Sequence, residues 1–232
     1  MYYRYQKVFC LITLPYKQAG MSVSKDLSGE RRNYIKHELI EKNVASSPFE
    51  QFAQWFDDAG KSGVLERNAM TLATATDIGK PSARIVLLKS FSDRGLVFYS
   101  NYDSRKGTEI SENGQGAILF YWDVMERQIR IEGTIGRVEQ AMSDAYFSSR
   151  PVESQLSAIV SNQSRTIPSR QFLEDKLAEV RNTGVIKRPV NWGGYILQPN
   201  YFEFWQGRAN RLHDRLVYEL EQGVWKLKRL AP

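Results

Sequence analysis

The segments Ala117-Ile-Leu-Phe-Tyr-Trp122 and Arg127-Gln-Ile-Arg-Ile-Glu-Gly-Thr-Ile-Gly-Arg-Val138 decide the class of fold. In the second segment Ile129, Ile131 and Ile135 alternate with polar side chains, so one face of an extended strand is buried and the other is polar. A short connection separates the two segments, which is typical of paired antiparallel strands. The sequence therefore predicts a half-buried antiparallel pair at the centre of the chain.

Further strand-like segments flank this pair on both sides. Tight turns at Asp77–Lys80 and Ser92–Gly95 separate the N-terminal segments, and Glu221–Gly223 forms a hairpin turn near the C-terminus. Sequential strands joined by tight turns favour an antiparallel arrangement. The additional predicted strands are Thr71–Thr76, Ala83–Phe91, Leu96–Ser100, Gly194–Leu197, Tyr201–Trp205, Leu212–Leu220 and Val224–Leu230.

Helices are inserted between these strands and do not alternate with them one for one. The sequence Ser47-Pro-Phe-Glu50 is a capping box with proline in the first turn, and it predicts a helix start. Phe49, Phe52 and Phe56 then share one helix face, and the helix ends at Gly60–Gly63. We expect a mainly β protein with peripheral helices, of the α+β class, built as a closed antiparallel barrel. The other predicted helices are Asp103–Asn113, Gln140–Ser149 and Ser169–Asn182.

The chain is predicted to consist of an extension, an arm and one domain. Residues 1–20 hold three basic residues, no acid and an apolar run that faintly resembles a signal peptide. Met21 follows a poor cleavage site, so we expect a disordered extension or one upstream of the true start, and a cytoplasmic protein. Residues 21–47 are polar and predict a mobile arm with a short helix over Arg31–Ile40. Residues 48–232 contain no linker and predict a single domain.

Composition excludes several classes of protein. The 232 residues carry a formal net charge of +6, and 3 of those 6 charges lie in residues 1–20, so net charge is weak support for nucleic-acid binding. Cys10 is the only cysteine, and His37 and His213 are the only histidines, so we expect neither a disulfide nor a metal site. No apolar run approaches the roughly 20 residues that span a bilayer. Neither a glycine-rich phosphate loop nor a G-x-S-x-G motif occurs.

Arginine and lysine near predicted strand ends carry the strongest indication of a site. Within Arg211-Leu-His-Asp-Arg215, strand alternation puts Arg211, His213 and Arg215 on one face. Such groups repel one another unless an anion lies among them, and arginine is suited to bidentate phosphate contact. Two interpretations stay open on this pattern: a phosphorylated small ligand, or an exposed strand whose arginines pair with carboxylates. The other cations in such positions are Arg84, Lys89, Arg105, Lys106 and Arg150.

These residues fall in longer motifs that resemble the pyridoxamine 5′-phosphate oxidase family. The C-terminal motif is Phe202-Glu-Phe-Trp-Gln-Gly207, continuing to Arg211-Leu-His-Asp-Arg215. The resemblance runs from about Arg31 to the C-terminus, with the blocks in the family's order. The other blocks are Arg84-Ile-Val-Leu-Leu-Lys89, Phe98-Tyr-Ser-Asn101, Ser104-Arg-Lys106, Glu126-Arg-Gln128, Tyr146-Phe-Ser-Ser-Arg-Pro151, Ser154-Gln155, Ser161-Asn-Gln-Ser164, Trp192-Gly-Gly194 and Arg229-Leu-Ala-Pro232.

The resemblance implies an antiparallel split β-barrel that works as a homodimer, with FMN bound at the subunit interface. It also implies that some of the FMN contacts come from the second subunit. Strand parity places Arg84 and Lys89 on opposite faces, so a shared pocket requires a bulge or twist at the strand end. The implied FMN-binding residues are Arg84, Ile85, Val86, Leu87, Leu88, Lys89, Tyr99, Ser100, Arg105, Lys106, Gln128, Gln163, Ser164, Trp205 and Arg215.

A second set of residues is implied to bind the substrate. Lys89, Tyr146, Arg150 and Ser154 would hold its phosphate, and Arg211, Leu212 and His213 would face its pyridine ring and reacting carbon. Arg31 and Tyr34 belong to an arm segment that resembles a family segment able to fold over the substrate.

The implied reaction oxidises pyridoxamine 5′-phosphate or pyridoxine 5′-phosphate to pyridoxal 5′-phosphate. A hydride passes from the substrate's C4′ carbon to the flavin, oxygen reoxidises the flavin to give hydrogen peroxide, and the amine substrate releases ammonia. Arg211 is the candidate catalytic residue that orients the substrate and stabilises charge, and His213 is the candidate for polar positioning.

Three alternatives to this function differ in what they predict. A phenazine-type oxidase of the same fold keeps the flavin site and changes the substrate. A non-catalytic FMN- or pyridoxal-phosphate-binding protein binds its ligand without turnover. A nucleic-acid-binding protein has an affinity that falls steeply with salt, whereas we expect no nucleic-acid partner.

Overall fold

The computed structural model describes residues 25–30 and 33–232. It divides into two units, Met1–Arg32 and Asn33–Pro232. In the first unit, within the described residues, the backbone N–H and the hydroxyl of Ser28 donate hydrogen bonds to Asp26. The extension predicted for residues 1–20 and the lid residue Arg31 lie outside the described residues.

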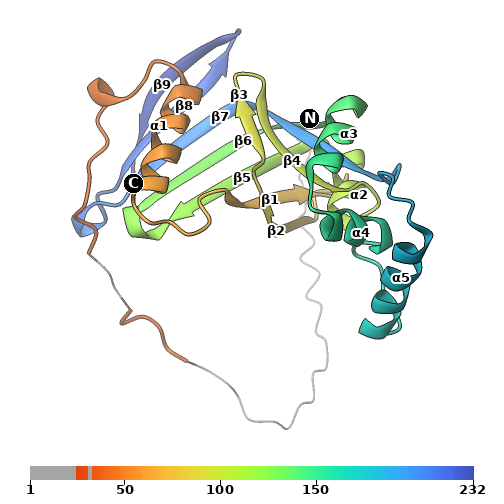
Figure 1. The fold of residues 1–232 in the computed structure, drawn as a ribbon. Helices are drawn as coiled ribbons and strands as arrows, with labels where there is room; N and C mark the ends of the chain where they lie inside the picture. The colour runs from red at the N-terminus through yellow and green to blue at the C-terminus, as the bar shows by residue number, and fades with distance from the viewer. Residues whose placement is uncertain (1–24, 31–32) are drawn as a thin grey trace, which may run out of the picture. The chain divides into compact units, whose positions relative to one another are not determined.

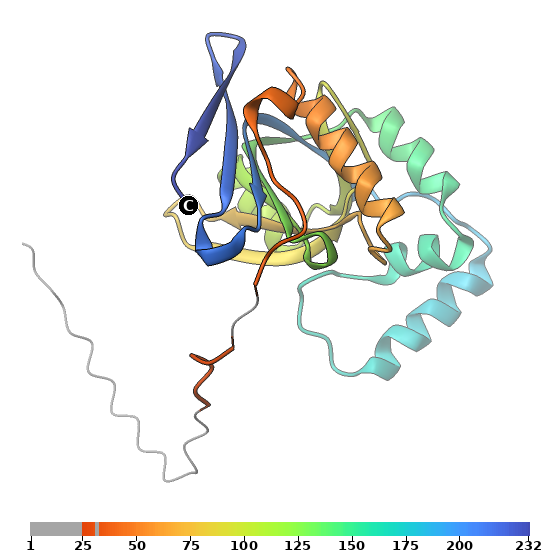
Figure 2. The same cartoon turned by 90° about the vertical axis from the view of Figure 1, so that its left-hand side faces the viewer.

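One antiparallel sheet forms the body of this unit (Figure 1). Its strands follow the order β2-β1-β5-β6-β7-β4-β3, β8 pairs with β7, and β9 pairs with β8. Figure 2 shows the sheet curling around the core, with α1 across one side and α3, α4 and α5 gathered at another. The mainly β fold with peripheral helices is therefore confirmed. The strands are β1 Ala69–Ala75, β2 Pro81–Leu87, β3 Ser90–Ser92, β4 Gly95–Asn101, β5 Gln115–Trp122, β6 Arg127–Arg137, β7 Trp192–Gln206, β8 Asp214–Glu221 and β9 Val224–Leu230.

The core lies inside the curled sheet, beneath α1. β5 and β6 contribute the alternating side chains that the sequence predicted, and Ile129, Ile131 and Ile135 are all buried. α1 buries Phe52 and Trp55 against the sheet, so its predicted apolar face is confirmed. The helices are α1 Pro48–Lys61, α2 Arg105–Glu112, α3 Gln140–Ser149, α4 Val152–Val160 and α5 Arg170–Thr183, with 3-10 turns η1 Glu41–Asn43, η2 Asp123–Met125 and η3 Ala209–Arg211.

The start of α1 differs in detail from the predicted capping box. The helix begins at Pro48, as expected, but the side chain of Ser47 makes no capping hydrogen bond. The first intrahelical bond instead runs from the N–H of Gln51 to the carbonyl of Ser47. Proline in the first turn, with its backbone angle already near the helical value, favours the helix start here.

The helix predicted over Arg31–Ile40 is wrong for the described residues 33–40, which form no helix. The N–H groups of Ile35 and Lys36 donate to the carboxylate of Glu126, and the N–H of Leu39 donates to Asp214. These bonds replace the bonds a helix would make within itself. The compact unit thus begins at Asn33 and includes residues 33–47, and its only helical turn before Pro48 is η1.

The two strands predicted over Gly194–Leu197 and Tyr201–Trp205 are one 15-residue strand, β7. Its pairing with β6 shifts register between Glu132 and Gly133, so that one extra residue of β7 lies at the bulge. A side chain at Gly133 would come within 2.1 Å of the carbonyl oxygen of Gln198, so the bulge requires glycine there. The long apolar strand predicted over Ala83–Phe91 is instead divided into β2 and β3.

Candidate functional site

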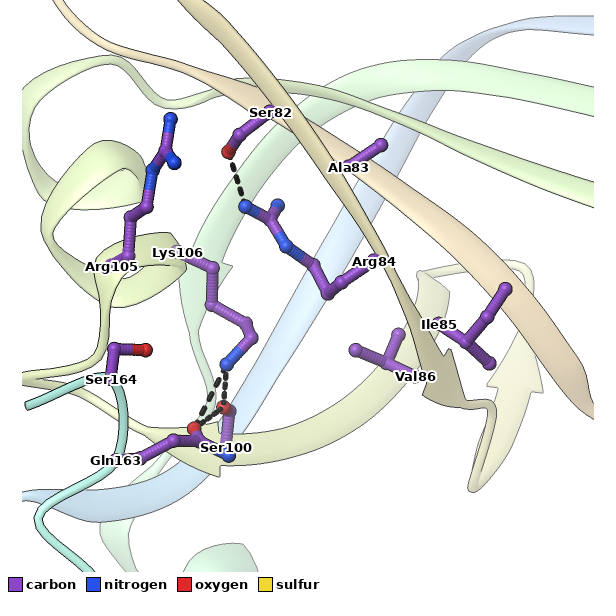
Figure 3. A pocket seen from close by; sticks show the side chains of 10 residues that line it. All are labelled: Ser82, Ala83, Arg84, Ile85, Val86, Ser100, Arg105, Lys106, Gln163 and Ser164. Atoms are coloured by element: carbon purple, nitrogen blue, oxygen red, sulfur yellow. Dashed lines mark hydrogen bonds between the residues drawn. The ribbon is translucent and has the colours of Figure 1, made fainter. Parts of the chain in front are cut away.

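A pocket lies between β2, the end of β4, the start of α2 and the loop at Gln163 and Ser164 (Figure 3). Its volume is about 440 Å³. Eight of its ten lining residues were predicted to bind FMN, and Ser82 and Ala83 were not. The sequence also predicted no role for the neighbouring Glu109. The lining residues are Ser82, Ala83, Arg84, Ile85, Val86, Ser100, Arg105, Lys106, Gln163 and Ser164.

The first turn of α2 directs two cations into this pocket. Ser104 caps the helix, because its hydroxyl accepts a hydrogen bond from the N–H of Gly107. Gly107 is required here, since a Cβ would lie 2.1 Å from the carbonyl oxygen of Tyr102. The tight approach of α2 to the end of β4 places Lys106 beside Ser100, and Arg105 lines the same pocket.

Lys106 is a buried amine whose partners are all neutral. It is 7% exposed, and its Nζ donates to Gln163 Oε1 at 2.9 Å, Ser100 Oγ at 3.0 Å and Ser104 Oγ at 3.2 Å. Burial, followed by the nearby charge of Arg84, lowers the pKa of Lys106 to about 8. Within the described residues no carboxylate forms an ion pair with it. A buried ammonium without a counterion is the arrangement that an anionic ligand completes.

Glu109 orients the two arginines of the pocket. Its carboxylate accepts from Arg105 Nε at 2.9 Å and from Arg84 Nη2 at 3.2 Å. It also accepts hydroxyl hydrogen bonds at 2.5 Å from Thr74 and from Ser82. Burial alone would raise the pKa of Glu109, but these hydrogen bonds lower it to about 2. Arg105 and Glu109 are four residues apart on one helix, and that spacing is the sequence signal that could have identified this carboxylate.

An aromatic stack adjoins the pocket at the end of β4. The rings of Tyr99 and Tyr146 stack with centroids 3.8 Å apart, and Trp192 stacks on Tyr99 at 5.6 Å. The guanidinium carbon of Arg150 lies 4.8 Å from the ring centre of Trp192. Burial lowers the pKa of Arg150, and its buried Nη1 has no hydrogen-bond partner in the described structure. Arg150 is thus a second cation positioned for an acceptor that the chain itself does not supply.

Other predicted site residues lie across the far end of β7. Gln128 on β6 is paired with Trp205 on β7, and Trp205 is paired with Arg215 on β8. The ring of His213 lies 4.7 Å from that of Trp205, and Tyr34 meets both rings edge-on at 5.7 Å. We call these five residues the ring end.

His213 is held in one orientation at the ring end. Its Nδ1 accepts a hydrogen bond from the backbone N–H of Arg208 at 3.1 Å. Burial, together with the charge of Arg211, lowers the pKa of His213, which favours the neutral ring. A neutral imidazole that accepts at Nδ1 carries its proton on Nε2. His213 therefore presents a hydrogen-bond donor.

The predicted strand alternation of Arg211, His213 and Arg215 is wrong. β8 begins only at Asp214, and Arg211 lies in η3 with φ of 62°. Asn210 also has a positive φ, so the chain turns sharply before the strand and Arg211 is exposed. Arg215, in contrast, has Nε 2.7 Å from Glu203, so the alternative of pairing with a carboxylate holds for this arginine.

The remaining predicted residues are dispersed over the unit. Lys89 follows the end of β2 and is exposed, and its N–H donates to the carbonyl of Val97 at 2.8 Å. The break between β2 and β3 at Leu88 and Lys89 removes the strict parity that set Lys89 and Arg84 on opposite faces. Leu88 is buried in the core, and Ser154 lies on α4, a helix that the sequence did not predict.

The curled antiparallel sheet and its cation-lined pocket define a split-barrel protein. Residues 56–184 match the family described as pyridoxamine 5′-phosphate oxidase, and residues 192–232 match the pyridoxine 5′-phosphate oxidase C-terminal dimerisation region. The chain belongs to the pyridoxamine 5′-phosphate oxidase family.

Relatives and solved structures agree with this assignment. A pyridoxine/pyridoxamine 5′-phosphate oxidase of Bordetella pertussis is 52% identical over 216 residues, which cover 91% of this chain and 100% of that protein. The chloroplastic pyridoxine/pyridoxamine 5′-phosphate oxidase 1 of Arabidopsis thaliana is 48% identical over 221 residues, covering 92% of this chain but 42% of the longer plant protein. The structure is similar to that of PhzG from Burkholderia lata in complex with tetrahydrophenazine-1-carboxylic acid, with a TM-score of 0.80 and 34% identity over 84% of this chain and 98% of that one.

Among the described residues, no helix is long and apolar enough to cross a membrane. No group of three or more His, Cys, Asp or Glu side chains in that part of the chain could hold a metal ion.

Proposed function

We propose that this chain oxidises pyridoxamine 5′-phosphate and pyridoxine 5′-phosphate to pyridoxal 5′-phosphate, with FMN as cofactor and oxygen as acceptor. Hydrogen peroxide would be the second product, and the amine substrate would also release ammonia. The single observation that carries the proposal is the charge of the pocket, where Arg84, Arg105 and Lys106 face one carboxylate, Glu109.

The pocket residues fit the phosphate of FMN. Lys106 is buried among neutral partners, so a phosphate would supply the counterion that the protein omits. Arg84 and Arg105 are already oriented by Glu109, which reduces the cost of ordering them when the ligand binds. Bound FMN would supply the redox chemistry, accepting the hydride from the substrate and returning the electrons to oxygen.

Arg150 supports a second phosphate position, that of the substrate. Its Nη1 is buried without a partner, and its guanidinium is held over Trp192. Tyr146, stacked on Tyr99, lies in the same aromatic cluster and offers a hydroxyl. We propose that these groups hold the substrate's phosphate, together with Lys89 and Ser154 from the neighbouring segments.

The ring end is suited to hold the substrate's pyridine ring. His213 presents Nε2–H as a donor, and Tyr34 and Trp205 enclose it with aromatic surface. Arg211 is exposed beside His213, with no ion-pair partner in the described structure, so its guanidinium is available to orient the substrate and stabilise charge near the reacting carbon. Leu212 is exposed next to it.

The pocket and the ring end lie far apart in one chain, which indicates that two copies of the chain build each site. Ser100 of the pocket is paired with Gly193 at the start of β7, whereas Trp205 of the ring end lies near its other end. At about 3.3 Å per residue, these positions are about 40 Å apart along the strand, farther than one flavin extends. We therefore propose a homodimer in which the pocket of one protomer faces the ring end of its partner, with FMN between them.

The edge of the sheet supports this arrangement. β2, which carries Arg84, is the last strand on its side of the sheet order, and Ile85 is 64% exposed on it. An exposed apolar side chain on an edge strand beside the pocket is suited to a subunit contact. Residues 192–232, which hold Trp205, His213 and Arg215 of the ring end, match a dimerisation region.

The test is a visible spectrum of the purified protein, followed by addition of pyridoxamine 5′-phosphate without oxygen. Flavin absorption at about 450 nm that bleaches when pyridoxamine 5′-phosphate is added supports the oxidase. A flavin that stays oxidised shows a flavin protein with another substrate or none. A protein that binds no flavin, even with added FMN, contradicts the proposal.

A same-fold oxidase of another ring compound is the second candidate. The likeness to PhzG, whose structure holds tetrahydrophenazine-1-carboxylic acid, favours it. Nη1 of Arg150, which is buried and has no hydrogen-bond partner among the described residues, favours a phosphorylated substrate instead, since a carboxylated ring without phosphate would leave the phosphate position empty. Bleaching by a dihydro- or tetrahydrophenazine carboxylic acid, but not by pyridoxamine 5′-phosphate, would decide for this candidate.

A further inference from the structure

Glu126 is a buried carboxylate on a tightly fixed turn at the ring end. It is 2% exposed and has φ of 57° in the left-handed region, between η2 and β6. Its N–H donates to the carbonyl of Asp123 at 3.1 Å, and its carbonyl accepts from the N–H of Gly207 at 2.8 Å. The side-chain amide of Gln206 also donates to that carbonyl, at 3.2 Å. The turn is therefore tied to the end of β7, the strand that carries Trp205.

The carboxylate of this turn holds the arm that precedes the barrel. Glu126 Oε2 accepts from the N–H of Ile35 at 3.0 Å and from the N–H of Lys36 at 3.2 Å. The ammonium of Lys36 adds a hydrogen bond of 2.5 Å to the carbonyl of Val124 in the same turn. Hydrogen bonds from two successive N–H groups to one carboxylate oxygen fix the direction of the arm as well as its position.

The fixed arm places Tyr34 over the ring end. Ile35 follows Tyr34 directly, and the Tyr34 ring meets Trp205 and His213 edge-on. The ring also fills the space above Gly207, where a Cβ would lie 2.7 Å from Tyr34 Cγ. Within the described residues the Tyr34 hydroxyl makes no hydrogen bond, so the position of the ring depends on the backbone that follows it and on these ring contacts.

We infer that Glu126 is a positioning residue for the reaction: it holds the backbone of Ile35 and Lys36 so that Tyr34 covers the substrate's ring. The inference rests on the proposed function, because it assigns the ring end to the substrate. It adds a buried group, 91 residues from Ile35 in the chain, that acts on substrate affinity through Tyr34.

The test compares Glu126→Asn with Glu126→Gln in the FMN-loaded protein. Asparagine tolerates the left-handed backbone but is shorter, so it loses both arm N–H groups, whereas glutamine keeps an acceptor oxygen at the same reach. We expect Glu126→Asn to raise KM for pyridoxamine 5′-phosphate about tenfold, with kcat and FMN content unchanged. Glu126→Gln should stay close to the unaltered protein, and Glu179→Ala, an exposed carboxylate on α5, is the matched control.

Two further measurements separate positioning from general damage to the fold. Tyr34→Ala leaves the turn intact and should raise KM similarly, and the double variant with Glu126→Asn should be no worse than Tyr34→Ala alone. Tryptic cleavage after Lys36, followed by mass spectrometry, should be about tenfold faster in Glu126→Asn because the arm is released. This second readout needs no oxidase activity.

The outcomes distinguish the inference from the function on which it rests. Unchanged KM in Glu126→Asn, or effects that add in the double variant, would overturn the role of Glu126 while the oxidase stands. A chain that shows no oxidation at all would overturn the proposed function, and the role of Glu126 in it, even where cleavage still reports the release of the arm.

Discussion

Two buried carboxylates each lie between two arginines, but their surroundings differ in charge. Glu109 accepts hydrogen bonds from Arg84 and Arg105, and Lys106 adds a third cation to the same pocket. One carboxylate against three cations leaves an excess of two positive charges. Glu203 instead belongs to a balanced group.

In the Glu203 group every cation has its carboxylate. Glu203 lies 2.6 Å from Arg130 Nη2 and 2.7 Å from Arg215 Nε, and Glu132 also contacts Arg130. Hydrogen bonding to Glu203 raises the pKa of Arg215. Two arginines against two carboxylates need no ligand to complete them.

The difference shows that buried arginines alone do not mark an anion site; the local charge balance does. Sequence motifs assign Arg105, Lys106 and Arg215 alike to FMN. The structure distinguishes them, because the pocket of Arg105 and Lys106 has cations in excess, whereas carboxylates balance the charge around Arg215. We expect the Glu109 pocket to determine ligand affinity and the Glu203 group to determine the stability of the sheet.

The largest expected effect is on folding, from Glu203→Ala. Removal of this carboxylate leaves Arg215 without its ion-pair partner and Arg130 with Glu132 alone, and because both arginines are only partly buried the cost is about 2 to 3 kcal/mol. The unfolding free energy of the FMN-free protein, measured by urea denaturation, should fall by that amount. Glu109→Ala should cost less, because the Arg105 side chain is 57% exposed and returns to solvent, and the more buried Arg84 keeps its hydrogen bonds to Leu72, Thr74 and Ser82. Equal losses of unfolding free energy in Glu203→Ala and Glu109→Ala would contradict this difference between the two carboxylate groups.

Lys106→Met is expected to weaken FMN binding about a hundredfold. The substitution keeps the length of the side chain and removes one charge-assisted contact to the phosphate in a buried position. Titration of the FMN-free protein followed by flavin fluorescence measures the Kd. Lys226→Met, on the exposed face of β9, is the control and should leave it unchanged. A change below threefold in Lys106→Met would place the phosphate elsewhere.

Arg211→Ala is expected to reduce turnover about thirtyfold while the Kd for FMN stays within twofold. Arg211 is an exposed cation at the ring end and belongs to neither carboxylate group, so its removal should affect the substrate and not the cofactor. Steady-state rates and flavin content of the same preparation provide the two readouts. Equal loss of both would contradict the substrate-side assignment.

Much of the fold was predictable because the signals were local. Alternation in β6, the aromatic face of α1 and the hairpin at Gln222 and Gly223 each depend on residues near one another in sequence. The long strand β7 was not predictable, because its continuity through a bulge depends on its pairing with β6 across the sheet.

Like the fold, the site was predictable where the signal lies in residues close together in sequence. Motifs identified most of the pocket, but they could not show that Arg215 is neutralised by Glu203 or that Arg84 and Arg105 share Glu109. The positive φ at Arg211 was also hidden, since the non-glycine residue there gives no sequence sign of a turn. Charge balance and backbone direction depend on tertiary contacts that a motif does not record.

The last and smallest effect concerns pH, and it has opposite signs for folding and for binding. The pKa of Lys106 is about 8 in the folded protein, below its usual value of 10.5. Between these values the unfolded chain binds a proton that the folded protein has released, so the stability of the FMN-free protein should rise with pH across this window and be lower below about pH 8.

FMN affinity should move the other way, because the bound phosphate favours the charged amine. The phosphate is already a dianion above its second pKa of about 6, so only Lys106 titrates in this range. From pH 7 to pH 9 the Kd should rise about tenfold, since binding must then restore the proton to Lys106. Lys106→Arg keeps the positive charge over this whole pH range, so it should abolish the pH dependence of both the stability and the FMN affinity. Urea denaturation and FMN titration at the same series of pH values test this directly. If stability and FMN affinity change with pH in the same direction, or if the Kd of the unaltered protein does not depend on pH, the excess charge of this pocket does not come from Lys106.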